Sequence, residues 1–213
     1  MRTAKVKVFT IDELKGNVQE HAIAKEREIY WEWGLTETLD EFVIEFLEEK
    51  GFHAADTDWD ATGRQCGRPY VNFGFHARHG EESDYILELA QVPKELFEKC
   101  RGDISVSVHC SDLHPLNRSQ VELEECVAME DTEDDNEYKT IRDIVEEIKK
   151  HVQEYVDDVC REAGELLGEK FEHLMSDEYM IGLIEANEME FLSDGTVWDK
   201  SLEEVGNETA ETA

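Results

Sequence analysis

The chain is poor in positive charge. Only 21 Lys and Arg stand against 53 Asp and Glu in 213 residues, which gives a formal net charge of −32. Nucleic acid is excluded as a direct ligand, because its binding depends on Lys and Arg side chains that neutralise phosphates. An anionic membrane surface is excluded for the same reason. Two explanations of the charge remain: a partner with a basic surface, or a charge that only keeps the chain in solution.

Long apolar runs are also missing. No stretch of about 18 apolar residues occurs, so we expect no transmembrane helix. The opening segment MRTAKVKVFTIDEL lacks the apolar core of a signal peptide. We therefore expect a cytoplasmic protein, located in the host cytoplasm if a phage encodes it. The five cysteines contain no Cys-x-x-Cys pair, and reduced thiols are expected in that compartment.

The three prolines leave room for long regular elements, and a hydrophobic fraction of 40% is enough for a core. Hydrophobic periodicity predicts an α+β fold: a small antiparallel sheet with N-terminal helices and a long acidic C-terminal helical segment. The expected helices cover about 11–33, 36–50, 83–99 with a break at Pro93, 135–175 and 177–187. The expected strands cover about 5–10, 52–59, 70–75, 104–109 and 121–127.

The domain organisation follows from these elements. We expect residues 1–130 to form an α+β domain. Residues 131–202 should hold the long helix, a further helix and a hairpin, packed on the same core, and residues 203–213 should form a disordered tail. Thr10 to Glu13 has the sequence of a capping box, which predicts the start of a helix.

The negative charge is concentrated toward the C-terminus. Residues 119–213 hold 30 acids and 7 bases, a net of −23, whereas residues 1–118 have a net of −9. In the helix predicted over 135–175, carboxylates three or four residues apart lie about 5–6 Å from one another, a spacing comparable to that of DNA phosphates. We predict that six of them contact a basic partner as a DNA mimic: Glu147, Glu154, Asp157, Asp158, Glu162 and Glu165. The alternative is a solvated helix face without a partner.

Three stretches of the chain carry a resemblance to a known family. They are VKVFTIDELKGNVQEHAI, WDATGRQCGRPYVNFGF and SDEYMIGLIEANEMEFLSDGTVW. Together they resemble small acidic tailed-phage proteins that are often labelled antitoxins of a toxin–antitoxin stability system. Where that family has a Ser-Gln-Gly-Asp-Gly-like run, this chain reads Gly63-Arg64-Gln65-Cys66-Gly67, so Gln65 and the glycine character are kept.

The resemblance implies a phage-type cytosolic α+β protein and carries over no catalytic residue. Because phages use acidic proteins to block host nucleases and restriction or CRISPR complexes, it favours a counter-defence inhibitor of a host DNA-binding or defence protein. An antitoxin that neutralises a basic toxin is the alternative, since it would use the same acidic face without imitating DNA.

The strongest metal candidate is His76-x-x-His79 together with Cys110 and His114. Zinc takes four N or S ligands in a tetrahedron, and these residues stand near the ends of two predicted hairpins. Their spacing matches no zinc finger. We therefore favour no metal and no cofactor, and a zinc-dependent enzyme or zinc-stabilised fold stays as an alternative.

Asp56, Asp58 and Asp60 alternate along a predicted strand and share one face, where they could hold Mg²⁺ or Ca²⁺. The EF-hand pattern fails, because its glycine would fall on Ala61 and its final Glu on Gly67, so we favour a solvated strand face. The chain also lacks Gly-x-Ser-x-Gly, a P-loop and Gly-x-Gly-x-x-Gly. We therefore expect a binding protein rather than an enzyme.

Overall fold

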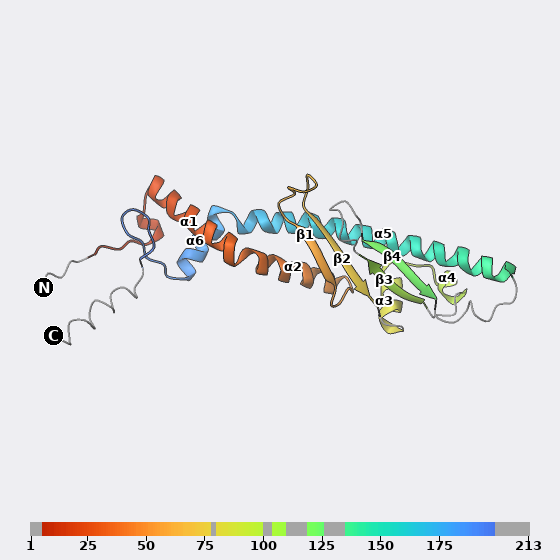
Figure 1. The fold of residues 1–213 in the computed structure, drawn as a ribbon. Coiled ribbons are helices and arrows are strands. Elements are labelled where there is room, and N and C mark those ends of the chain that lie inside the picture. The colour runs from red at the N-terminus through yellow and green to blue at the C-terminus, as the bar shows by residue number, and fades with distance from the viewer. Residues whose placement is uncertain (1–5, 78–79, 100–103, 110–118, 126–134, 199–213) are drawn as a thin grey trace, which may run out of the picture. The chain divides into compact units, whose positions relative to one another are not determined.

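The computed structural model describes residues 6–77, 80–99, 104–109, 119–125 and 135–198. They form the α+β fold that the sequence predicts (Figure 1). Two compact units divide the chain: unit 1 comprises Met1–Glu37 and Glu172–Ala213, and unit 2 comprises Thr38–Phe171. The predicted division at residue 130 follows the order of the sequence, whereas unit 1 joins the two ends of the chain. The predicted tail over 203–213 lies outside the described residues.

Unit 2 is built on an antiparallel sheet with the strand order β1-β2-β3-β4. The strands are β1 (Asp56–Asp60), β2 (Tyr70–His76), β3 (Ile104–His109) and β4 (Gln120–Glu125). Trp59 lies opposite Val71 in the first hairpin, and Val108 lies opposite Val121 in the second. Both predicted strand pairs are therefore confirmed. The pair Phe75 and Val108 joins β2 to β3.

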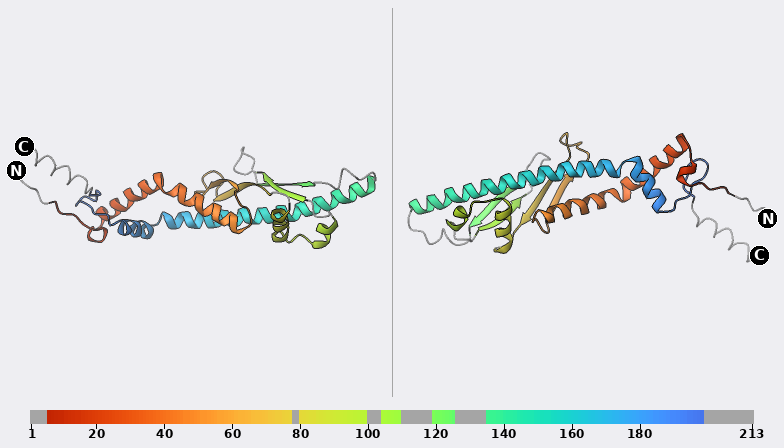
Figure 2. Two further views of the ribbon diagram at one scale, coloured as in Figure 1. Left: turned by 90° about the horizontal axis from the view of Figure 1, so that it is seen from below. Right: turned by 180° about the vertical axis from the view of Figure 1, so that it is seen from behind.

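One face of the sheet is apolar and packs against helix α5 (Asp135–Leu174), which Figures 1 and 2 show lying along it. Side chains alternate along a strand, so Phe73 and Phe75 share this face. Phe52 joins them, with its ring centroid 4.6 Å from that of Phe73, 5.3 Å from that of Phe75 and 5.9 Å from that of Tyr155 on α5. Such aromatic pairs stabilise by about 0.5–1.5 kcal/mol each beyond their burial.

Helix α5 contributes a continuous apolar stripe to this core. Its buried residues recur every three or four positions: Ile148, Val152, Val156, Val159, Ala163 and Leu167. That spacing keeps them on one side of the helix, as the sequence pattern predicts. Unit 2 also holds most of α2 (Leu35–Glu49), together with α3 (Glu81–Leu89) and α4 (Lys94–Lys99). Pro93 separates α3 from α4, as expected.

Two glycines allow α5 to approach the start of β2. A Cβ atom on Gly164 would lie 3.0 Å from the carbonyl oxygen of Pro69, and one on Gly168 would lie 2.7 Å from Cγ of the Pro69 ring. Non-bonded carbon atoms normally stay about 3.5–4.0 Å apart. A larger residue at either position would therefore push the helix away from the strand.

The outer strands carry the acidic residues of the sheet. β1 (DTDWD) contains three Asp and β4 (QVELEE) contains three Glu, whereas the inner strands β2 (YVNFGFH) and β3 (ISVSVH) contain none. Charged residues on an edge strand discourage its pairing with another chain. This gives the three Asp residues of β1 a structural explanation that needs no metal.

Unit 1 packs helix α1 (Asn17–Trp33) against α6 (Asp177–Ala186), with the short 3₁₀ helix η1 (Ile11–Glu13) in contact with both. Its core consists of Ile11, Leu14, Ala22, Ile23, Met180, Ile184 and Phe191. The predicted capping box is confirmed, because the Thr10 N–H donates to the Glu13 carboxylate at 3.0 Å.

Two sequence predictions in unit 1 are wrong. The strand predicted over 5–10 is reduced, within its described residues, to a single bridge between Phe9 and Phe191. The helix predicted over 11–33 is broken, because η1 ends at Glu13 and α1 begins only at Asn17. Gly16 stands in the break at φ +56°, a left-handed conformation that glycine reaches without strain.

Two buried carboxyl groups have opposite pKa shifts. Burial alone would raise the pKa of Asp60, but hydrogen bonds outweigh it and lower the pKa; the donors include the Thr62 hydroxyl at 2.6 Å, the Thr62 N–H at 2.8 Å and the Gln65 N–H at 3.1 Å. Glu26 on α1 is also 9% exposed, and burial raises its pKa. Folding therefore favours the charged form of Asp60 and the neutral form of Glu26.

The Asp60→Asn variant should lower the free energy of unfolding by about 1–3 kcal/mol at pH 7, because the amide accepts the N–H and hydroxyl donors of the turn less strongly. The folded-state pKa of Asp60 is depressed, so its contribution is present above the ordinary carboxyl pKa of about 3.9 and is lost as the pH falls through the folded value. Urea unfolding at neutral and acidic pH measures the difference in the free energy of unfolding between the wild-type protein and the variant. Asp58→Asn, at an exposed position of β1, is the control, and an equal loss there would contradict the assignment.

The Glu26→Gln variant should act in the opposite direction and raise the free energy of unfolding at pH 7, because glutamine has no charge to bury. The raised folded-state pKa means that the carboxylate destabilises unit 1 above its ordinary pKa, and protonation removes this penalty as the pH falls. The gain should therefore shrink between pH 7 and about pH 4. Glu28→Gln, exposed on the same helix, should show no gain, and a pH-independent gain from Glu26→Gln would refute the explanation.

Candidate functional site on helix α5

Four of the six predicted contact residues lie in one row on α5, opposite the buried stripe. They are Glu147, Glu154, Asp158 and Glu165, separated by seven, four and seven positions, and all four are exposed. Their side chains protrude strongly: those of Glu154, Asp158 and Glu165 are 65%, 71% and 68% exposed. The structure therefore presents these carboxylates together, and their contact with a partner stays a prediction.

The other two predicted residues make contacts within unit 2. Asp157 accepts a hydrogen bond from the Gln153 amide at 3.0 Å. The Glu162 carboxylate pairs with the Lys50 ammonium at 2.8 Å, next to the C-terminal end of α2. Asp157 and Glu162 are therefore engaged by other side chains of unit 2, whereas the four carboxylates of the row lie along one side of the helix.

The row is not purely acidic. Arg161 lies within it, 2.8 Å from Asp158 and 3.8 Å from Glu165, and the hydrogen bond with Asp158 raises the pKa of the guanidinium further. Lys150 approaches Glu154 at 3.9 Å. In total α5 holds 12 acids and 6 bases, so it carries only −6 of the −23 found in residues 119–213. The long helix is therefore not where most of that charge lies.

A second acidic row on α2 was missed by the sequence analysis. α2 has six acids and no base in 15 residues. Glu41, Glu45 and Glu48 are exposed at positions i, i+4 and i+7, with Ile44 beside them at 42% exposure. Counting acids and bases in the predicted helix over 36–50 would have found this row.

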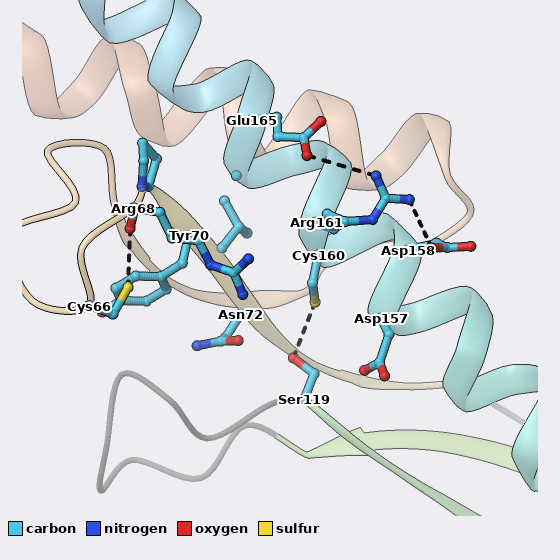
Figure 3. Close-up of a pocket in the computed structure, with 13 residues that line it drawn as sticks. Cys66, Arg68, Tyr70, Asn72, Ser119, Asp157, Asp158, Cys160, Arg161 and Glu165 are labelled. Atoms are coloured by element: carbon cyan, nitrogen blue, oxygen red, sulfur yellow. Dashed lines mark hydrogen bonds and ion pairs between the residues drawn. The ribbon is translucent and has the colours of Figure 1, made fainter.

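A cleft of about 510 Å³ opens in unit 2 between α5 and the turn that joins β1 to β2 (Figure 3). Its walls include Arg68 and Asn72 on the strand side and Asp157, Cys160 and Arg161 on the helix side. Three of the predicted contact residues, Asp157, Asp158 and Glu165, line this cleft. The cleft was not predicted, because its walls come from separate parts of the sequence.

Ser119 lines the cleft, and Gln153 of α5 holds its backbone. The Ser119 hydroxyl oxygen accepts from the Phe73 N–H at 2.9 Å. The Gln153 amide donates to the Ser119 carbonyl at 2.9 Å, and its oxygen accepts from the Val121 N–H at 2.9 Å. One side chain of α5 thus satisfies both a donor and an acceptor of the β4 edge.

Most of the zinc candidate cannot be placed. His79, Cys110 and His114 lie outside the described residues, and His76 has its Nδ1 atom 2.5 Å from the Ser107 hydroxyl. Within the described ranges, no three His, Cys, Asp or Glu side chains are arranged to hold a metal ion. Asp60 is the last of the three alternating Asp residues of β1. Its carboxylate already accepts hydrogen bonds from the N–H groups of Thr62 and Gln65 in the following turn.

Cys66 and Cys160 line the cleft, and neither forms a disulfide. Cys66 donates to the Arg68 carbonyl at 3.1 Å, and Cys160 lies 3.7 Å from the Ser119 hydroxyl. The other cysteines, Cys100, Cys110 and Cys126, lie outside the described residues. Along the part of the chain that the structure describes, no helix combines the length and apolar character needed to span a membrane.

No protein-family model, curated protein or solved structure matches the chain. The resemblance to acidic tailed-phage proteins therefore depends on the three sequence stretches alone and stays a prediction.

Replacing Gln153 tests how α5 holds the sheet edge. Gln153→Ala should lower the free energy of unfolding by about 1–3 kcal/mol, because the Val121 N–H and the Ser119 carbonyl lose their partner. The amide hydrogen of Val121 should also exchange faster with solvent, as measured by NMR. Gln120→Ala, on the exposed side of β4, is the control. Unchanged exchange at Val121 in Gln153→Ala would show that Gln153 does not hold the edge.

Proposed function

We propose that the protein acts by binding, as an inhibitor that covers the basic surface of a host DNA-binding or defence protein. The observation that carries this proposal is the exposed row of Glu147, Glu154, Asp158 and Glu165 on a helix whose opposite side is buried in unit 2. Packing of that buried stripe fixes the row in position, so the carboxylates need no ordering when they meet a partner.

The acidic row on α2 supports the DNA-mimic form of this proposal. Duplex DNA presents two rows of phosphates, and one helix offers only one row of carboxylates. On α5 the neighbouring carboxylates of the row are separated along the axis by about 6–10 Å, which is sparser than the phosphates of DNA. α2 lies beside α5, since Lys50 pairs with Glu162 and the Lys170 ammonium lies 5.9 Å from the ring of Phe42. The two helices together supply two rows.

Lys150 and Arg161 favour a second candidate function. A partner that is attracted only by opposite charge can bind an acidic row that also contains ion-paired bases. A phosphate backbone carries no positive groups, so a close imitation of DNA has no need of Lys150 and Arg161. An antitoxin that neutralises a basic toxin would therefore fit the same surface. Both functions are binding functions, and neither uses a catalytic step.

Charge reversal on α5 tests whether the row itself contacts the partner or whether only the total charge of the protein matters. Capture from host lysate first identifies the partner, whose affinity is then measured for the pair Glu154→Lys with Asp158→Lys. We expect a loss of tenfold or more, about 1.4 kcal/mol or above, because two attractive contacts become repulsive. The matched control is Glu20→Lys with Glu28→Lys on α1, which changes the net charge equally at exposed positions of unit 1.

The outcomes separate the explanations. Equal losses in both pairs would show that only total charge matters, and no loss in the α5 pair would remove the row from the contact. Wild-type binding should weaken steeply with salt. Competition by duplex DNA supports mimicry, whereas binding that duplex DNA does not displace supports the antitoxin-like alternative. Far-ultraviolet circular dichroism of each variant checks that α5 remains helical.

A further inference from the structure

The cleft beside α5 has the size of a small-molecule site. Its volume of about 510 Å³ lies within the range of about 300–1,000 Å³ that is usual for ligand pockets. All of its lining residues belong to unit 2. A site for a small ligand in this cleft would be separate from the binding of a protein partner, and so goes beyond the proposed function.

The strand side of the cleft offers a cation. Figure 3 shows the Arg68 guanidinium projecting into the cleft toward Asn72. Arg68 forms no ion pair with any residue in the described ranges, although the chain has 53 acids for 21 bases. A guanidinium presents two parallel N–H donors that match a carboxylate.

Asn72 lines the cleft beside Arg68 (Figure 3). It is only 8% exposed, and its side chain makes no hydrogen bond to another described residue. Among the described residues, Ser105 Oγ is the fully buried side-chain atom that lacks a partner, so the Asn72 amide stays accessible at the cleft that it lines. Its NH₂ group can donate to the same carboxylate that Arg68 would bind.

The helix side of the cleft is acidic. Arg161 balances Asp158 and Glu165 through its two ion pairs. The Asp157 carboxylate accepts from the Gln153 amide, and a carboxylate has room for further donors. Counting all lining side chains, three carboxylates face two guanidinium groups, which leaves the cleft with a net charge of −1. A ligand with one carboxylate and two ammonium groups, of net charge +1, complements it.

We propose that the cleft binds a basic amino acid, with its carboxylate held by Arg68 and Asn72 and its ammonium groups directed to Asp157. The acidic wall disfavours nucleotides and other polyanions, because their charges would meet three carboxylates. Arg68 disfavours a simple diamine, because such a ligand has no group to place against the guanidinium. The ligand therefore needs both signs of charge.

Titration with L-lysine tests this site, followed by NMR chemical shifts of the free protein. We expect saturable one-site binding, and 1,5-diaminopentane, which lacks the carboxylate, should bind at least about tenfold more weakly. Arg68→Gln should weaken L-lysine binding by a similar factor. Arg64→Gln is the matched control, since Arg64 is exposed in the same turn and does not line the cleft.

Three results would overturn the proposal: no saturable shift up to about 10 mM L-lysine, equal binding of the diamine, or equal effects of Arg64→Gln and Arg68→Gln. Because Arg68 is exposed, its replacement should leave the fold intact, and the amide spectrum checks this directly. The titration uses no protein partner, so its failure leaves the proposed function untouched, and the failure of partner binding leaves this site untouched.

Discussion

The approach of α5 to the start of β2 is the contact on which the candidate site depends. Gly164 and Gly168 have no side chain at the point where Pro69 meets the helix. The helix backbone can therefore come closer to the strand than two opposed side chains would allow. The following strand residues, among them Asn72, then stand beside the helix, and the cleft opens between them. The cleft is thus a consequence of two missing side chains as much as of the charged residues that line it.

Apolar packing, rather than ion pairing, holds the acidic row in place. Exposed ion pairs such as Arg161 with Asp158 stabilise by only about 0–1 kcal/mol. Repulsion between like charges on a helix costs a few tenths of a kcal/mol per pair, roughly 0.2–0.5. Burial of a single valine or leucine contributes about 1.5–3 kcal/mol, and the stripe of α5 buries several of them. The helix can therefore keep its exposed carboxylates without local compensation for each one.

The sequence predicted the elements better than it predicted the site. Periodicity located α5 and both strand pairs, because a long amphipathic helix and alternating strands leave strong local patterns. It missed the break at Gly16, since Ile11, Leu14 and Val18 keep a helical spacing across a glycine that turns the chain. The cleft could not be predicted, because only the fold brings Arg68, Ser119 and Asp157 to one place. That Arg68 forms no ion pair with a described acidic residue likewise depends on which residues the fold places around it. The acidic row of α2, by contrast, could have been predicted by counting the acids and bases in that segment of the sequence.

Screening decides which acidic residues can determine affinity for a partner. At physiological ionic strength the Debye length is about 8 Å, so a carboxylate farther than this from the contact adds mainly to the rate of encounter. The net charge of −32 therefore governs attraction at a distance, whereas a few side chains govern the bound state. Glu147 makes no ion pair with a described residue, and Glu154 has only the long contact to Lys150 at 3.9 Å. These two carboxylates can meet a partner's cations directly. Asp158 and Glu165 must first share or release Arg161, at an exposed position where that exchange costs little. For the basic partner that we propose, the N-terminal part of the row, which does not line the cleft, is therefore the expected first contact.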